Sequence, residues 1–279
     1  MTASTDWGAS FASAGVDAMT AYDEILVPRL FDPWAEVLLA AVGVAPGSRV
    51  LDVACGPGTV ARLAAVRVGP SGHVAACDLS PAMLAVAQAK APLAGAAPIT
   101  YHQCPADDLE AADEAFDIAL CQQGLQFFPD RAGAVTEMRR ALKPGGRAGV
   151  SVWCAIEECP FWDALASAVG AVLGKDAEST FRGGPWGLPD SGDLTPLFDD
   201  AGFTDVRVVR RTLPVVFEGG PAQIVATLQA AAVGPQVAAL DDRGRADLLA
   251  AADEALAPLL DDEGGVRSEA ATHIVVATR

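Results

Sequence analysis

The chain has 279 residues, of which 51% are hydrophobic, and its formal net charge at pH 7 is −17. A chain of this length can bury a large core, so we expect one globular domain, or a domain with an elaborated lid. Its acidic surface repels phosphate groups, which argues against nucleic-acid binding and against binding to anionic membranes.

No segment has the features of a signal peptide, and the longest apolar runs are too short to span a bilayer. The six cysteines include no C-x-x-C pair, so we expect reduced thiols that act as small apolar fillers. A metal cluster would need closer spacing and histidine partners, and no metal site is predicted. These features predict a cytoplasmic protein, either a monomer or a homodimer.

The N-terminal region, residues 14–42, has the pattern of helices that are broken at Pro28 and Pro33. A helical segment ahead of a parallel sheet cannot join the sheet, so residues 1–44 are expected to lie as a cap across the strand ends. Tyr22 and Trp34 stand in this cap. Simple helix packing and ligand contact are equally good explanations for these two aromatic residues.

The stretch Val50–Ala61 reads as a buried strand, a turn of small residues and the start of a helix. Such a turn lets the backbone approach a ligand closely and directs helix N-terminal N–H groups at it. Its G-x-G-x-x-A spacing fits a dinucleotide fingerprint, with the acid Asp78 about twenty residues further on. That match is weak by itself.

A second pattern in the same stretch places an acid inside the strand, as Asp52-x-Ala54-x-Gly56-x-Gly58. A charged residue late in a buried strand needs a partner. The α-ammonium group of S-adenosylmethionine (SAM) offers one, whereas the pyrophosphate of a dinucleotide would be repelled. The strand acid therefore favours SAM.

Further strand and helix units follow with short connections, which predicts a parallel sheet with right-handed crossovers. The second strand ends at Asp78, where a carboxylate can accept hydrogen bonds from both hydroxyls of a ribose. Ser80-Pro81 then starts a helix, as an N-cap followed by proline at the first helical position. The next strands are expected at residues 99–104, 116–121 and 147–153.

Beyond residue 153 the pattern loosens, and residues 154–193 are predicted to be a lid insertion with a helix near residues 160–173. Its aromatic side chains would suit a flat apolar substrate, although core packing explains them as well. They are Phe161, Trp162, Phe181 and Trp186. A sixth strand is expected within residues 204–217, a second lid insertion at 218–268, and a last strand at 272–279. We predict a single domain in which residues 45–153 form the cofactor-binding half.

The motifs of the first half occur together in a defined order. They are Val50–Val60, Asp78–Leu84, Phe116–Cys121 and Leu142–Gly146. In this order the chain resembles the class I SAM-dependent methyltransferases, and is most similar to their small-molecule branch, typified by the ubiquinone/menaquinone-biosynthesis methyltransferases. The resemblance covers about residues 20–153 and includes Tyr22-Asp23 and Trp34. It implies a Rossmann-like, doubly wound α/β fold with a seven-stranded, mostly parallel sheet whose last strand is antiparallel.

The resemblance also implies a cofactor site. Asp52 would hold the ammonium group of SAM, Asp78 the ribose hydroxyls, and Met83 would pack on the adenine together with Leu79. The full set of cofactor-binding candidates is Tyr22, Trp34, Asp52, Ala54, Gly56, Gly58, Asp78, Leu79, Met83, Pro105, Ala106, Asp107, Cys121 and Gln122.

One position departs from the family pattern. Family members carry Asp-Ala after the third strand, where the aspartate accepts from the adenine amino group, and this chain has Pro105-Ala106. Either Asp107 substitutes for that acceptor or the contact is absent.

Methyl transfer from a sulfonium is an in-line displacement, so positioning supplies much of the acceleration. A base is needed only where the acceptor is not already nucleophilic. The three histidines, His73, His102 and His273, fall on strands or their edges and are expected to be structural. The residues expected to orient the acceptor are Tyr22, Gln123, Gln126 and Trp153.

Three functions remain open from the sequence. The first is SAM-dependent methyl transfer to a small, flat and apolar acceptor such as a quinone or another secondary metabolite. The second is an NAD(P)-dependent oxidoreductase, which the G-x-G-x-x-A spacing and Asp78 motivate. The third is a methyltransferase-fold protein that binds SAM without methyl transfer, as a sensor or a cyclase.

Overall fold

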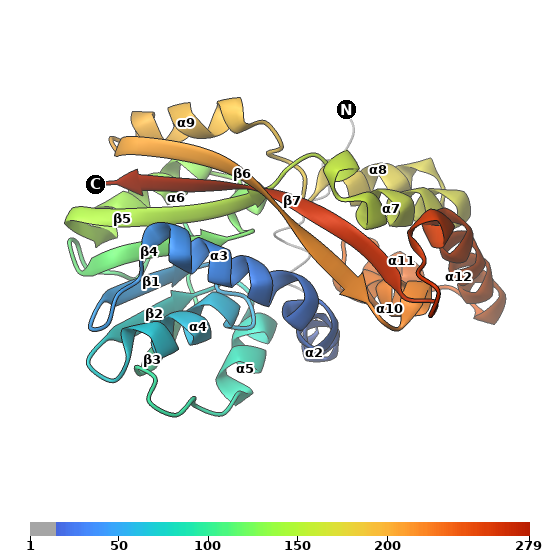
Figure 1. The fold of residues 1–279 in the computed structure, drawn as a ribbon, viewed down its shortest axis with the longest axis horizontal. Helices are drawn as coiled ribbons and strands as arrows, with labels where there is room; N and C mark the ends of the chain where they lie inside the picture. Colours follow the sequence, from blue (N-terminus) through green and yellow to red (C-terminus); the bar gives the residue numbers. More distant parts are fainter. Residues whose placement is uncertain (1–14) are drawn as a thin grey trace.

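The computed structural model describes residues 15–279 and contains a central sheet (Figure 1). The strands are β1 (Arg49–Val53), β2 (His73–Cys77), β3 (Ile99–His102), β4 (Phe116–Gln122), β5 (Leu142–Trp153), β6 (Thr204–Phe217) and β7 (Val266–Thr278). Their order in the seven-stranded sheet is β3-β2-β1-β4-β5-β7-β6. Strands β1 to β5 are parallel, and β7 runs antiparallel to both β5 and β6. The predicted fold class is confirmed.

The strand order reverses at β1, because the chain moves outward to β2 and β3 on one side and to β4 and β5 on the other. At such a switch point the loops after the strands diverge and leave a crevice at the carboxyl ends. Strand β1 is buried from Val50 to Val53 and is apolar except for Asp52. The sheet therefore places this acid at the head of the crevice.

Helices cover both faces of the sheet. They are α2 (Val16–Ile25), α3 (Asp32–Val42), α4 (Thr59–Val68), α5 (Pro81–Ala89), α6 (Arg131–Ala141), α7 (Pro160–Leu173), α8 (Lys175–Gly183), α9 (Ser191–Asp200), α10 (Gly220–Ala226), α11 (Gly234–Ala238) and α12 (Asp242–Leu256). Short helical segments are η1 (Val27–Phe31), η2 (Leu125–Phe127), η3 (Ile156–Glu158), η4 (Thr227–Ala230) and η5 (Ala257–Leu259). Helices α3 and α4 share one apolar cluster with α7, whereas α6 and α9 belong to the cluster on the other face. Within residues 15–279, no helix is both long and apolar enough to cross a membrane.

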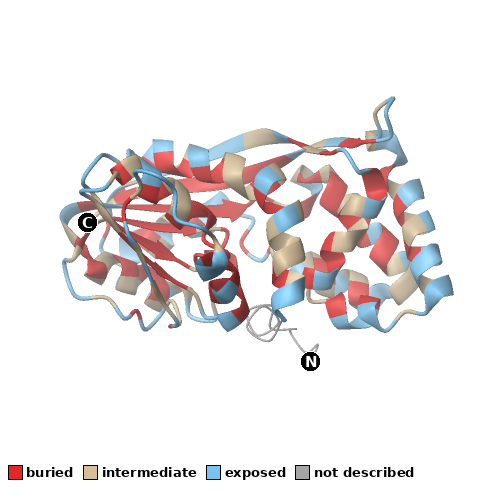
Figure 2. Ribbon diagram, turned by 90° about the horizontal axis from the view of Figure 1, so that it is seen from below, coloured by how far each residue is buried: buried red, intermediate tan, exposed pale blue. Residues whose placement is uncertain are grey.

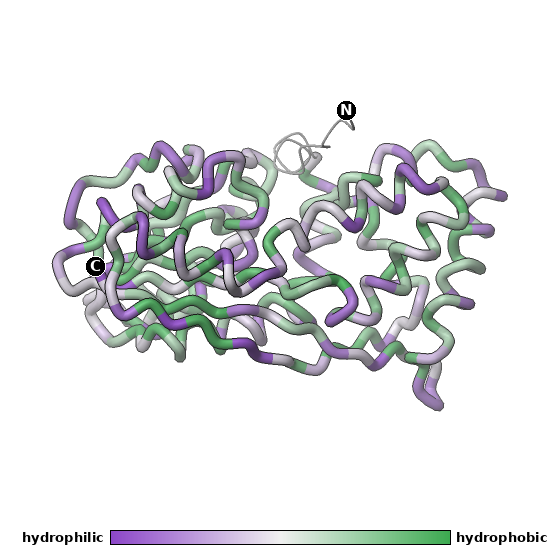
Figure 3. Tube along the Cα trace, turned by 90° about the horizontal axis from the view of Figure 1, so that it is seen from above, coloured by the Kyte–Doolittle hydropathy of each residue, from purple (hydrophilic) through white to green (hydrophobic). Residues whose placement is uncertain are grey.

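Strands β6 and β7 extend beyond the rest of the sheet into a group of helices made of α7, α8, α10, α11 and α12 (Figure 1). The inner faces of these helices are buried and their outer faces exposed (Figure 2). Hydrophilic stretches gather at the outer turns (Figure 3). Residues 154–193, expected as a lid insertion with a helix near residues 160–173, contain that helix as α7 and are mostly helical, and their four aromatic side chains are buried.

The N-terminal region differs from the prediction of helices broken at two prolines. Helix α2, the π-helix η1 and helix α3 follow one another almost without interruption. Pro28 and Pro33 each lie in the first turn of a new segment, a position at which helices tolerate proline. Strand β7 also begins earlier than expected, at Val266, because it pairs with β6 along its whole length.

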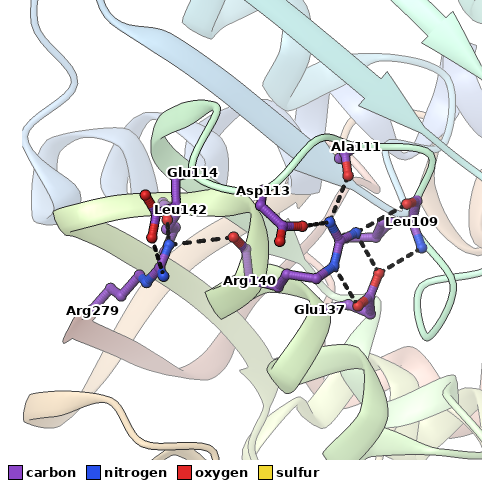
Figure 4. A network of polar contacts seen from close by, with 8 residues as sticks. All are labelled: Leu109, Ala111, Asp113, Glu114, Glu137, Arg140, Leu142 and Arg279. Carbon is purple, nitrogen blue, oxygen red and sulfur yellow. Dashed lines mark hydrogen bonds and ion pairs between the residues drawn. The ribbon is translucent and has the colours of Figure 1, made fainter.

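The acidic stretch after β3 is fixed by two arginines (Figure 4). Arg140 donates to the carbonyls of Leu109 and Ala111 at 3.2 and 2.7 Å, and it pairs with Glu137 at 2.7 Å. Glu137 in turn accepts from the amide of Leu109 at 3.0 Å. Arg279, near the end of β7, binds Glu114 at 2.7 Å. This network anchors the loop that begins at residue 105.

The packing of α3 on the sheet depends on Gly149 of β5. A Cβ at this position would overlap Val42 Cγ2 and would lie 3.2 Å from Leu120 Cδ2. We expect Gly149→Ala to lower the free energy of unfolding by about 1–3 kcal/mol, because the core must shift to accept the methyl group. Urea unfolding measures this. The control is Gly183→Ala in α8, where no atom lies within 4 Å and stability should be equal or higher. Equal stability of the two variants would contradict the argument.

Candidate functional site

A cavity of about 200 Å³ lies at the carboxyl ends of β1, β2 and β4. Most of the predicted cofactor-binding residues line it: Tyr22, Asp52, Ala54, Gly56, Asp78, Leu79, Met83, Pro105, Ala106, Asp107 and Gln122. Three predicted residues, Trp34, Gly58 and Cys121, are not in its wall. Trp34 is buried in the cap, where it packs edge-on against Trp153 with the ring centroids 6.2 Å apart.

The turn after β1 has a left-handed backbone at alternate residues. The φ angles are 55° at Ala54, 54° at Gly56 and 84° at Gly58. The two glycines in this turn have different roles. A Cβ at Gly56 would face only Met83 Sδ at 3.9 Å, so this residue leaves space at the cavity. A Cβ at Gly58 would press on Tyr101 and on helix α5, so this glycine serves packing behind the cavity.

Asp52 has the least compensated side chain in the cavity wall. It is 1% exposed, and neither carboxylate oxygen has a hydrogen-bond partner among the described residues. Burial raises the pKa of Asp52 to about 8, even though the backbone amide of Ala61 in α4 favours its charged form. A cationic group that enters the cavity would reverse this effect, because an opposite charge at short range favours the ionised carboxylate. The orphaned acid thus fits the ammonium group of SAM.

Asp78 is held in one orientation at the end of β2. Its two oxygens accept from the amides of Gly56 and Ser80, at 2.7 and 2.8 Å. Burial raises the pKa of Asp78 even though these amides favour its charged form. A carboxylate has about four acceptor positions, so it retains capacity for ligand hydroxyls. A ribose diol fits this arrangement.

The opposite wall of the cavity is apolar and comes from α5 and the loop after β3. Met83 is buried there, and Pro105 and Ala106 lie nearby. Leu79 is 50% exposed at the mouth, where an exposed leucine has apolar surface to offer a ligand. Asp107 is exposed and lines the same wall.

A second cavity, of about 80 Å³, adjoins the first. The two share four lining residues: Tyr22, Phe31, Gln123 and Phe127. The remaining walls are almost entirely apolar and carry the aromatic residues Trp153, Trp162, Phe181 and Trp186. Three of the four aromatics of the predicted lid therefore face this cavity, and the fourth, Phe161, packs on Phe217 instead.

The polar groups at the junction of the cavities form a short chain. Gln123 has φ 55° and donates to Thr272 Oγ1 at 3.2 Å. Gln126 donates to Gln123 Oε1 at 3.2 Å but lines neither cavity. Tyr22 stacks on Phe31 with centroids 5.1 Å apart, and burial raises its pKa well above the ordinary value, so its phenol stays protonated at neutral pH.

None of the histidines lines either cavity. Sequence reasoning missed Phe31, Phe127, Phe128 and Thr59, all of which line the first cavity. A signal for Phe127 and Phe128 was present, since they follow β4 at the edge where the other site residues lie. Phe31 had no such signal, because it was expected to lie in a broken helix.

Two contacts fasten the N-terminal helices over the first cavity. Gln122 donates to the carbonyl of Phe31 at 2.9 Å. Lys90 donates to Asp23 at 2.6 Å and to the carbonyl of Pro57 in the glycine turn at 2.8 Å. The cap is thus tied to the β4 end and to the cofactor turn at once.

The fold and this site place the chain in the class of Rossmann-like SAM-dependent methyltransferases. Phosphoethanolamine N-methyltransferase 2 of Haemonchus contortus, solved with SAM, has this fold, with a TM-score of 0.59 at 20% identity; the match covers 95% of this chain and 57% of that one. The chain belongs to the ubiE/COQ5 methyltransferase family, whose sequence model matches residues 13–218. SAM is the cofactor of this class, which favours it over a nicotinamide dinucleotide.

Two relatives extend the comparison. An uncharacterized protein of Mycobacterium tuberculosis is 36% identical over 129 residues, which are 46% of this chain and 46% of that protein. The chain therefore spans about half the length of this relative. The ubiquinone/menaquinone biosynthesis C-methyltransferase UbiE of Cupriavidus metallidurans is 31% identical over 195 residues, covering 66% of this chain and 78% of that protein.

Asp52→Asn should change how stability depends on pH. With a pKa of about 8, the folded chain keeps a proton on Asp52 that the unfolded chain releases near pH 4. The folded state binds the extra proton, so Asp52 makes stability fall as pH rises from about 4 to about 8, by at most about 1.4 kcal/mol per pH unit. The variant loses this contribution.

The measurement is urea unfolding of both proteins without ligand across that pH range. We expect the stability of Asp52→Asn relative to the unsubstituted chain to increase toward pH 8. The control is Asp108→Asn, which changes an exposed carboxylate outside the cavity wall and should leave the pH profile as it is. Parallel profiles for the unsubstituted chain and Asp52→Asn would refute the assignment.

Proposed function

We propose that this chain transfers a methyl group from SAM to a small, flat and apolar acceptor. The observation that carries the proposal is the pairing of the two cavities. One contains a buried acid without a partner, as a cationic cofactor requires, and the other is walled by aromatic rings. They meet at Tyr22 and Gln123, so a methyl group bound in one cavity can face an acceptor in the other.

In the cofactor cavity, Asp52 binds the ammonium group and Ala54 and Gly56 lie along the methionine part. Asp78 accepts from the ribose hydroxyls. Three facts support these roles: the orphaned oxygens of Asp52, the open space at Gly56, and the fixed orientation of Asp78. Leu79 and Met83 cover one side of the adenine.

In the acceptor cavity, the chain positions the acceptor and excludes water, and these effects matter more than acid–base chemistry. SAM supplies an electrophilic methyl group, and in-line displacement requires the nucleophile to lie on the axis behind it. The aromatic walls hold a flat ring and exclude water. Among residues 15–279, no carboxylate or histidine lines this cavity, and the raised pKa of Tyr22 makes its phenol a donor and not a base. The acceptor must therefore bring a nucleophile that is already ionised or electron-rich.

The comparisons are compatible with an apolar ring as acceptor. Several relatives bear names of quinone biosynthesis, among them demethylmenaquinone methyltransferase of Listeria welshimeri, 30% identical over 191 residues. Quinone precursors in their reduced form are flat, apolar and electron-rich, which matches the chemistry of the second cavity.

Calorimetric titration with SAM, S-adenosylhomocysteine (SAH) and NADH tests the cofactor. We expect saturable one-to-one binding of SAM and SAH and no binding of NADH. Transfer is followed with SAM carrying a radiolabelled methyl group and a tail-free naphthohydroquinone as acceptor. Absence of SAM and SAH binding would overturn the proposal. Binding together with label transfer to no acceptor, including a metabolite extract, would favour a sensor or a cyclase.

Asp107 provides a sharper test of adenine recognition. We propose that Asp107 accepts a hydrogen bond from the adenine amino group. It would replace the aspartate that family members carry where this chain has Pro105. Asp107 lines the cavity, and the loop behind it is fixed through Leu109. Asp107→Ala should weaken SAH binding by about tenfold, as loss of a charge-assisted hydrogen bond predicts. Asp108→Ala, the exposed neighbour outside the wall, should bind as the unsubstituted chain does. Equal affinities would show that the contact is absent.

A further inference from the structure

Three cysteines line the cofactor cavity: Cys55, Cys77 and Cys104. All three are free thiols, and each is at most 6% exposed. The sequence predicts small apolar fillers at these positions. All three thiols also face the cofactor cavity, so their chemistry needs separate consideration.

Two of these thiols come from neighbouring strand ends. Cys77 is the last residue of β2, and the parallel register pairs it with His102 of β3. The amide of Asp78 continues the pairing and donates to the carbonyl of His102 at 3.2 Å. Cys104 follows two residues later and lines the same cavity. Cys104 thus lies two residues beyond the register partner of Cys77, and the two thiols are close enough to share a hydrogen bond.

The two thiols have opposite chemical characters. A hydrogen bond from the Cys77 thiol lowers the pKa of Cys104 to about 7 and raises the pKa of Cys77 itself. Burial raises the pKa of Cys55 well above the ordinary value. The thiolate is the nucleophilic form, so Cys104 is the reactive member, Cys77 its neighbour, and Cys55 an unreactive thiol in the same cavity. A reactive cysteine beside a second thiol is the arrangement of residues that form disulfides reversibly.

We propose that Cys77 and Cys104 are a modification site that reacts with low-molecular-weight disulfides and closes to an intramolecular disulfide in the cofactor cavity. The Cys104 thiolate attacks one sulfur of the disulfide reagent, which forms a mixed disulfide and expels one reagent thiolate. Cys77 then loses its proton and attacks the sulfur of Cys104, which expels the second reagent thiolate. The two cysteines together lose two electrons and two protons, and the reagent is reduced to two thiols.

Closure of this bond would alter the cofactor site. Cys104 directly precedes Pro105 and Ala106, which form the apolar wall beside Met83. A disulfide requires a Cβ separation of about 3.5–4.5 Å and a fixed torsion, so its formation constrains this wall. We expect the oxidised chain to bind SAH more weakly and bound SAH to protect both thiols. This part of the inference rests on the proposed cofactor site.

The experiment uses the full chain, reduced and then freed of reductant, and treated with 2-hydroxyethyl disulfide under native conditions. Peptide mapping by mass spectrometry is expected to show a Cys77–Cys104 disulfide, with Cys55 still reduced. In Cys77→Ser, the reaction should stop at the mixed disulfide on Cys104, whereas Cys77→Ala also removes the hydrogen-bond donor and should form the mixed disulfide more slowly. Cys154→Ser is the matched control, since Cys154 is buried outside both cavities, and this variant should form the disulfide normally.

Two outcomes would overturn the inference. One is that Cys104 stays reduced under conditions in which the unfolded chain reacts, and the other is that Cys55 reacts as fast as Cys104. SAH titration of the oxidised and re-reduced chain then separates this inference from the proposed function. If SAH binds but no disulfide forms, the proposed function stands and the thiol site is rejected. If the disulfide forms but SAH does not bind at all, the thiol site stands and the proposed function is rejected. Binding that weakens at least about tenfold on oxidation and returns on reduction supports both.

Discussion

The site depends on one constraint, the burial of a carboxyl group without a partner near the end of the central strand. Asp52 lies between β2 and β4 in the sheet, where packing alone would select an apolar residue. Retaining an acid there costs free energy in the empty protein, and the raised pKa of Asp52 is the sign of that cost. A cation in the cavity removes the cost. The folded chain is therefore less stable when the cavity is empty than when a cation occupies it. In this way a buried charge contributes to ligand selectivity.

Backbone strain lies at the same edge of the sheet. Ala54 and Gln123 both hold a left-handed backbone that costs about 1 kcal/mol or more for a residue with a side chain. One follows β1 and the other follows β4, the two strands that flank the switch point. Ala54 turns the chain under the cofactor cavity, and Gln123 turns it where the two cavities meet. The other two non-glycine residues with positive φ within residues 15–279, Glu114 and Asp205, line neither cavity.

The sequence was sufficient to predict the fold and to name most of the residues that the structure gathers around the first cavity, because that information is local. Asp52, Ala54 and Gly56 fall within five residues of one strand end, and Asp78 ends the next strand. Parallel strands bring such ends together whatever the rest of the chain does. Trp34 was placed less well, since helical periodicity predicts that a tryptophan is buried but not which neighbours it meets. It packs in the cap against Trp153.

The acceptor cavity was beyond prediction for the opposite reason. Its wall takes residues from α2, η1, the loop after β4, the end of β5, helices α7 and α8, the loop after α8 and the segment around η4, which lie far apart in sequence. No spacing rule connects Phe31 with Trp186. Each aromatic residue alone reads equally well as core, and Phe161 is core in fact. Only the tertiary arrangement distinguishes an aromatic residue of the cavity wall from one of the core. Acceptor specificity in such a fold can therefore change through substitutions in distant segments, while the turn after β1 keeps its pattern.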